Sequence, residues 1–140
     1  MKVKKIEYAV RRDNVFDFET PSHTYILGNG IVSHNTQEMF SKAVVSGGCF
    51  EEGTLVRLAD GTNKPINEIV VGDLVITRDG VRDVTHTWDP DTLLEGEPDC
   101  YELEFEDGHK VVCSDTHPFA VNGQWVQAQD LTVGIECDII

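Results

Sequence analysis

The sequence has no long apolar run, and this absence argues against a membrane-spanning helix. Such a helix needs about 20 consecutive apolar residues, and no stretch of the 140 residues approaches that length. The basic residues at positions 1–5 are not followed by the apolar stretch of a secretory signal. We therefore expect a protein of the cytoplasm that has no membrane partner.

Basic side chains are also scarce, which argues against nucleic acid as a partner. The chain has 11 Lys and Arg against 25 Asp and Glu, a net charge of −14, whereas phosphate binding needs a basic face. The charge divides the chain into a first segment (residues 1–35, net +1), a linker (residues 36–48, net zero) and a last segment (residues 49–140, net −15). Either the acidic segment only keeps the protein in solution, or it attracts the basic start of the first segment and speeds their pairing.

The four cysteines lack the paired Cys-x-x-Cys spacing of common structural zinc sites. Cys113, His117 and Cys137 could still act as an irregular metal set, and four cysteines could form disulfides in a secreted protein. Nothing else indicates secretion, and Cys100 and Cys113 lie in strand-like apolar runs that favour core positions. We therefore expect no metal and no cofactor.

Short apolar runs separated by tight-turn residues predict an all-β fold. Asp-Gly pairs at 60–61, 79–80 and 107–108 and an Asn-Gly pair at 122–123 are typical of hairpin turns. Residues 101–105 alternate apolar and acidic side chains, the pattern of a strand with one face in water. We expect one domain of many short strands.

Two stretches interrupt this pattern. Residues 89–98 form an acidic loop with two prolines, and the linker has no clear period and ends in Ser-Gly-Gly. Single helical turns are predicted at 66–69 and 128–131. The expected strands are 2–12, 15–19, 25–27, 31–32, 54–58, 73–77, 81–88, 101–105, 109–113, 119–121 and 124–126.

One candidate reactive motif is the tripeptide His34-Asn35-Thr36. An Asn side-chain amide can attack its own carbonyl carbon, which forms a succinimide and cuts the chain after the Asn. A neighbouring His can transfer the required proton near neutral pH, and a following Thr supplies a hydroxyl nucleophile. The alternative is that Asn35 is an ordinary turn residue.

A second candidate is the pair Gly48-Cys49, in which the thiol can attack the preceding carbonyl and convert the peptide bond into a thioester. A third is Ser114 with His117, which directly follow a strand. The histidine could protonate the departing amine and the serine could orient the bond. The alternatives are a structural cysteine and a capped strand end with an ordinary surface histidine.

Together these motifs resemble the sequence blocks of inteins, the domains that carry out protein splicing. The resemblance covers the whole chain except the linker. Ser114 stands where the family usually has Thr, and the stretch from Asp17 to His23 is about one residue shorter and contains Pro21. The matching blocks are residues 49–54 with 65–75, residues 108–119, and residues 15–18 with 23–25 and 29–35.

The order of the blocks is reversed relative to an intein that splices in cis. The first segment resembles the C-terminal intein piece, and the last segment resembles the N-terminal piece. Their lengths of 35 and 92 residues suit a split mini-intein without a homing endonuclease. The resemblance implies a Hint (Hedgehog/intein) fold, which is horseshoe-like, all-β and pseudo-two-fold. It also implies a monomer that reacts once, with its own flanking peptide as the substrate.

The resemblance assigns the first steps of splicing to five residues. Cys49 attacks the carbonyl of Gly48 and forms a thioester, assisted by Ser114 and His117. Asp17 manages protons and charge when this thioester is passed on.

The later steps are assigned to the other junction. The Thr36 hydroxyl takes over the thioester as a branched ester, and Asn35 then cyclises with help from His34 and His23. His23 could instead make only a structural hydrogen bond. Because both junctions border the linker, the expected product is residues 36–48 closed into a thirteen-residue ring.

Three rival functions remain open. One is a disulfide or zinc scaffold, which thiol titration of the four cysteines would test. A Hedgehog-like self-cleaving domain would form the thioester at Cys49 but pass it to an external nucleophile, so that Asn35 would be dispensable. An acidic all-β binding module would perform no chemistry, and Cys49→Ala would change nothing measurable.

Overall fold

The structure is a computed structural model that describes residues 1–11, 15–34, 38–39, 42–43, 49–89 and 99–140. These residues form short antiparallel strands and two 3-10 turns, η1 (Ile66–Glu68) and η2 (Ala128–Asp130). The all-β prediction and both predicted helical turns are therefore confirmed. The described part of the chain contains no helix with the length and hydropathy needed to cross a bilayer.

The strands follow the turn signals closely along most of the chain. They are β1 (Val3–Arg11), β2 (Val15–Glu19), β3 (Thr24–Ile26), β4 (Val32–His34), β5 (Glu38–Met39), β6 (Lys42–Ala43), β7 (Phe50–Glu51), β8 (Leu55–Arg57), β9 (Asn63–Pro65), β10 (Leu74–Thr77), β11 (Gly80–Asp83), β12 (His86–Trp88), β13 (Asp99–Phe105), β14 (Lys110–Ser114), β15 (Pro118–Val121) and β16 (Gln124–Gln127).

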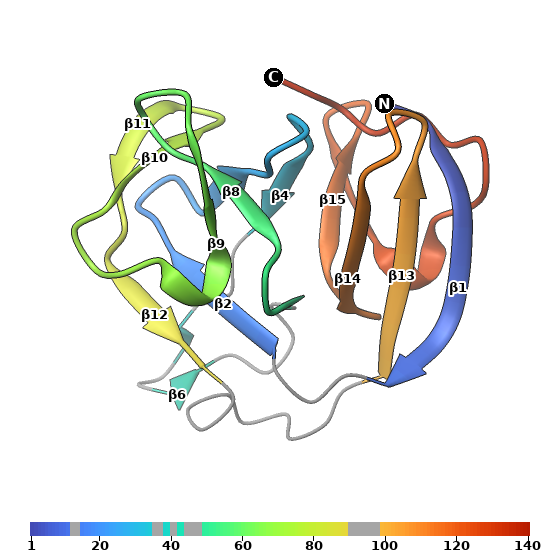
Figure 1. The fold of residues 1–140 in the computed structure, drawn as a ribbon, viewed down its shortest axis with the longest axis horizontal. Helices are drawn as coiled ribbons and strands as arrows, with labels where there is room; N and C mark the ends of the chain where they lie inside the picture. Colours follow the sequence, from blue (N-terminus) through green and yellow to red (C-terminus); the bar gives the residue numbers. More distant parts are fainter. Residues whose placement is uncertain (12–14, 35–37, 40–41, 44–48, 90–98) are drawn as a thin grey trace.

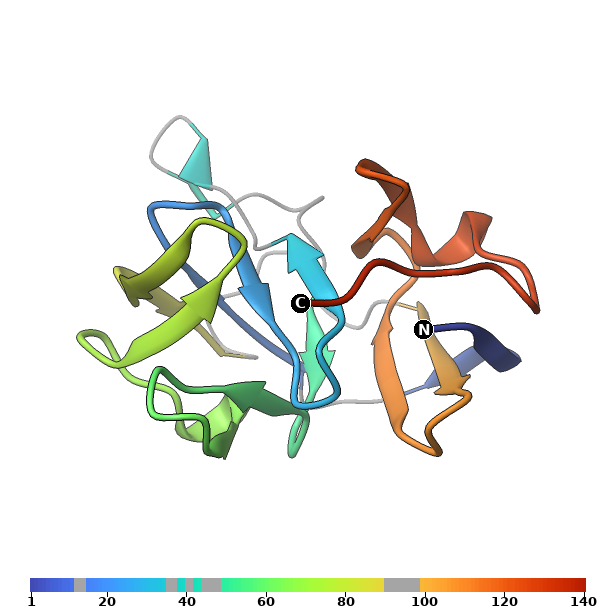
Figure 2. The same cartoon turned by 90° about the horizontal axis from the view of Figure 1, so that it is seen from above.

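The strands lie in two groups that are visible in both views (Figures 1 and 2). One group holds β8 to β12 with β2, and the other holds β1 and β13 to β15. The short strand β7 joins them, because it pairs with β14 on one side and with β2 on the other. The result is a six-stranded sheet in the order β1-β13-β14-β7-β2-β12. This arrangement is compatible with a Hint-like fold.

A second sheet also mixes the first and last segments of the sequence. Its order is β16-β15-β4-β3, and Ser33 of β4 lies opposite Phe119 of β15. At the outer edge of the larger sheet, β1 pairs with β13, and Lys5 lies opposite Glu104. Lys4 Nζ is 3.4 Å from the same carboxylate. Basic residues of the first segment therefore face acidic residues of the last segment.

One apolar core runs under both groups of strands. Phe50 lies near its centre, with ring centroids 6.2 Å from Tyr25 and 6.1 Å from Phe119. Cys100 and Cys113 are fully buried, as their apolar surroundings predicted, and the four cysteines are free thiols. Because Phe50 directly follows Cys49, the core holds the start of the last segment in place.

The expected single strand over residues 81–88 is wrong. It is divided into β11, which forms a hairpin with β10, and β12, which pairs with β2. Between them Val84 is fully buried, and the Thr85 N–H donates to the Glu19 carbonyl. The pairing strand changes at this point, so the two halves of residues 81–88 belong to different sheets. In the linker, the described pairs β5 and β6 form a short antiparallel ladder.

Candidate functional site

Cys49 and Ser114 are joined by two hydrogen bonds although they lie far apart in sequence. The Cys49 N–H donates to Ser114 Oγ at 3.0 Å, and the Ser114 N–H donates to the Cys49 carbonyl at 2.9 Å. The antiparallel pairing of Phe50 with Cys113 places them side by side. Cys49 is 1% exposed and Ser114 is fully buried. The backbone amide of Cys49 is thus held by the Ser114 hydroxyl.

His117 completes this cluster from the turn that follows β14. Its N–H donates to the Ser114 carbonyl at 3.1 Å, which directs the side chain back towards β7. The imidazole packs against the Phe50 ring with centroids 4.1 Å apart and is completely buried. The alternative of an ordinary surface histidine is therefore wrong.

The two ring nitrogens of His117 have different surroundings. Nε2 lies 2.5 Å from Ser33 Oγ, whereas the buried Nδ1 has no hydrogen-bond partner among the described residues. Burial disfavours the imidazolium, and the nearby His34 adds to this effect, so the pKa of His117 falls from 6.5 to about 3. The imidazole is therefore neutral at pH 7 and is a weak base.

Asp17 lies in β2 and is 2% exposed. Its Oδ1 accepts a hydrogen bond from the Tyr25 hydroxyl at 2.8 Å and another from the Phe18 N–H at 2.8 Å. Burial and the Asp17 carboxylate raise the pKa of Tyr25 well above its ordinary value, so this hydroxyl keeps its proton. Ser33 of β4 is the direct cross-strand partner of Tyr25.

Sequence reasoning missed Tyr25 and Ser33 as members of the site. Each was treated only as part of a strand or a matching block. The available signal was that a buried Tyr hydroxyl needs a polar partner, and that Asp17 lies in the preceding strand. Nothing in the sequence alone identifies that partner.

The two other predicted histidines form a separate part of the site. His34 ends β4 opposite Thr24 of β3. Its ring lies 6.4 Å from that of His23 in a nearly parallel arrangement, and 5.0 Å from the Trp125 ring in an edge-on arrangement. His23 is exposed and has a φ of 62°, a conformation that non-glycine residues rarely adopt. The structure therefore places His23 beside His34.

Three predicted site residues, Gly48, Asn35 and Thr36, lie outside the described residues. Their described neighbours are close to one another, because Ser33 contacts His117, whose ring packs on Phe50. The chain therefore enters and leaves residues 35–48 at one place.

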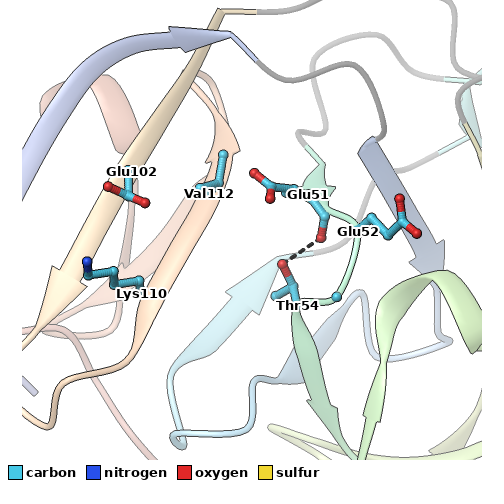
Figure 3. A pocket seen from close by; sticks show the side chains of 7 residues that line it. Glu51, Glu52, Thr54, Glu102, Lys110 and Val112 are labelled. Carbon is cyan, nitrogen blue, oxygen red and sulfur yellow. Dashed lines mark hydrogen bonds between the residues drawn. The ribbon is translucent and has the colours of Figure 1, made fainter.

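A polar pocket of about 240 Å³ lies beside this cluster along β7 (Figure 3). Three carboxylates and one ammonium group surround it, and the Thr54 hydroxyl donates to the Glu51 carbonyl at 2.7 Å. None of the predicted site residues lines it, so it is distinct from the predicted chemistry. Its lining residues are Glu51, Glu52, Gly53, Thr54, Glu102, Lys110 and Val112.

Within the described ranges, no three His, Cys, Asp or Glu side chains converge as a metal-binding group. The irregular set of Cys113, His117 and Cys137 is thus not assembled.

No protein-family model matches the chain. Over 55 residues it is 38% identical to the catalytic subunit of the V-type proton ATPase of Candida tropicalis. The matched stretch is 39% of this chain and 5% of that protein. The similarity is local and covers a small part of the relative.

Proposed function

We propose that this chain is a self-processing domain of the intein type, which splices out residues 36–48 as a ring. The observation that carries the proposal is the pairing of Cys49 with Ser114. The amide nitrogen of Cys49 is held at 3.0 Å by the Ser114 hydroxyl, and the buried, neutral His117 packs against the ring of Phe50, the next residue. These are the groups that an N-to-S acyl shift requires.

A second geometric fact supports splicing over simple cleavage. His34 and Cys49 border the two junctions, and their chain neighbours Ser33 and Phe50 both contact His117. Two junctions held at one place can react with each other without a long search, which lowers the entropic cost of the transfer between them.

The proposed reaction begins when the Cys49 thiol attacks the Gly48 carbonyl and the Cys49 amine departs. The Thr36 hydroxyl then attacks the thioester and releases the Cys49 thiol. Asn35 cyclises through its side-chain amide and breaks the bond to Thr36, with His34 and His23 proposed to assist. A final O-to-N shift joins Gly48 to Thr36 by a peptide bond.

We further propose that charge assists the pairing of the first and last segments. The β1–β13 ladder joins them, and the ion pair between Lys4 and Glu104 lies on it. The Met1 ammonium group also binds the Glu136 carboxylate at 2.5 Å. Exposed ion pairs contribute little to stability, so the expected effect is on the rate of encounter.

Mass spectrometry of denatured protein, before and after incubation at neutral pH with a reductant, tests the function. We expect a new species with the mass of residues 36–48 minus one water, together with separate first and last segments. A linear peptide would retain that water, which would indicate two hydrolyses instead of ligation. An unchanged mass would overturn the proposal.

Two variants separate splicing from its rivals. Asn35→Ala should prevent release of the ring and leave thioester formation intact, whereas a Hedgehog-like domain would not respond to this change. Cys49→Ala should abolish the thioester, whereas a binding module would be unaffected.

A further inference from the structure

The turn that carries His23 is tied to the tip of the β10–β11 hairpin by a closed ring of hydrogen bonds. The Arg78 N–H donates to Thr24 Oγ1 at 3.0 Å, and Thr24 Oγ1 lies 2.7 Å from Ser22 Oγ. The Ser22 hydroxyl donates to Asp79 Oδ2 at 2.7 Å. Because Arg78 and Asp79 are neighbours in the chain, the ring closes at the hairpin tip.

Each hydroxyl in this ring has one proton and one acceptor for it. Ser22 gives its proton to the Asp79 carboxylate, so the Thr24 hydroxyl must donate to Ser22 Oγ. Thr24 Oγ1 in turn accepts the Arg78 N–H. Loss of either hydroxyl would therefore break two hydrogen bonds of the ring.

The ring borders a residue with an unusual backbone conformation. His23 lies between Ser22 and Thr24, and its φ of 62° is one that a non-glycine residue rarely adopts. Its N–H donates to the Thr20 carbonyl at 3.0 Å, and the Thr20 hydroxyl donates to the Thr24 carbonyl at 2.8 Å. Strained backbone of this kind persists where the surrounding structure fixes it, and it gathers at functional sites.

The same hydrogen bonds set the position of His23 relative to His34. Thr24 is 1% exposed and is the direct cross-strand partner of His34. The His23 side chain is exposed to solvent, and its ring lies 6.4 Å from the His34 ring. An exposed side chain has few packing contacts to hold it, so the fixed backbone on both sides of His23 limits where its ring can lie.

We propose that three side chains of this ring position the His23 imidazole for the cleavage after Asn35. The positioning residues are Ser22, Thr24 and Asp79, and they act through His23. This inference rests on the proposed splicing function, in which the attacking side-chain amide loses a proton and the departing amine gains one. An imidazole can transfer such a proton near neutral pH, and its efficiency depends on being held within reach.

The test uses the full chain and follows two reactions in one sample by mass spectrometry. One is the release of residues 1–35, which reports cleavage after Asn35, and the other is cleavage before Cys49 by dithiothreitol. Thr24→Val removes a hydroxyl at nearly constant volume, and Asp79→Ala removes the exposed acceptor of the ring. Thr24→Ser and Asp79→Asn are the conservative variants, because they keep the hydrogen-bonding atoms.

We expect Thr24→Val and Asp79→Ala to slow the release of residues 1–35 about tenfold, a smaller loss than the 10²–10⁴-fold contribution typical of an acid–base group. Cleavage before Cys49 should keep its rate, and the conservative variants should restore most of the release. Asp83→Ala is the matched control, because Asp83 is exposed on the same hairpin but lies outside the ring. It should change neither rate.

A second background separates positioning from a general structural role. Because the ring acts through His23, Asp79→Ala should not slow the release further in a chain that already carries His23→Ala. Equal slowing by Asp79→Ala in both backgrounds would overturn the inference. If Thr24→Val does not fold, the exposed Asp79→Ala carries the same test.

The remaining outcomes distinguish this inference from the proposed function. A parent chain that never releases residues 1–35 would overturn the proposed function and the inference together. A parent that reacts, with Thr24→Val and Asp79→Ala reacting at the same rate, would overturn the inference alone.

Discussion

The backbone nitrogen of Cys49 and the hydroxyl of Ser114 are 3.0 Å apart, and the reverse backbone bond between the same residues is 2.9 Å long. This double link fixes the backbone amide of Cys49. It joins residues that are 65 positions apart in the sequence. Several consequences of this geometry can be measured.

Ser114→Ala should slow thiol-induced cleavage before Cys49 by about 10–100-fold, because a misplaced reacting group costs on this order. The buried Cys49 N–H would lose its partner, which should lower the free energy of unfolding by about 1–3 kcal/mol. Ser114→Thr keeps the hydroxyl and serves as the control. Equal rates for the alanine variant and the parent would contradict the orienting role.

Folding stability should fall as the pH drops below about 6.5. His117 has a pKa of about 3 when folded and about 6.5 when unfolded, so only the unfolded state binds this proton between those values. The loss should be about 2 kcal/mol between pH 6.5 and pH 5, at 1.36 kcal/mol per unit. Urea unfolding of Cys49→Ala protein, which does not react, measures it.

The comparison for this pH effect is His117→Gln in the same Cys49→Ala background. Its stability should change less over that pH range, whatever its absolute value. If the free energy of unfolding changes equally with pH in the two proteins, groups other than His117 cause the pH dependence.

Trp125→Ala should slow cleavage of the Asn35–Thr36 bond without affecting cleavage of the Gly48–Cys49 bond. The indole lies 5.0 Å from the His34 ring and limits the positions that this ring can adopt. We expect release of the linker to slow by about tenfold, consistent with a poorly placed proton donor, while thiol-induced cleavage before Cys49 keeps its rate. Mass spectrometry follows both reactions in one sample.

Arg78→Gln is the matched control, because the Arg78 guanidinium contacts the Trp125 ring but is not part of the His34 contact. Its effect on linker release should be smaller. If Trp125→Ala slows linker release and thiol-induced cleavage before Cys49 equally, the variant has instead lost structure generally.

Association of separately prepared first and last segments should slow with salt. The segments carry +1 and −15, and their basic and acidic residues meet along β1 and β13. We expect the association rate to fall about tenfold from low to high ionic strength, as screening removes steering. Lys4→Glu with Lys5→Glu should produce a similar fall at low salt and little further fall at high salt. Stopped-flow fluorescence measures the rate, and a salt-independent rate would contradict charge assistance.

Much of the fold could be predicted because its signals are local. The Asp-Gly and Asn-Gly turns and the alternation along residues 101–105 depend on neighbours in sequence, and the hairpin of β13 and β14 follows from them. The division of residues 81–88 could not be predicted. β11 pairs with the adjacent strand β10, whereas β12 pairs with β2, which is distant in sequence.

The sequence by itself determined the all-β class, the reactive residue types at the junctions and the pairing of Ser114 with His117 in one motif. These properties depend on turn chemistry, on side-chain reactivity and on spacing within a few residues. Tertiary structure alone decided that His117 is buried and neutral, that Ser33 contacts its ring, and that Tyr25 donates to Asp17. Burial and long-range hydrogen bonds arise only when distant strands pack, so no local pattern of residues contains them.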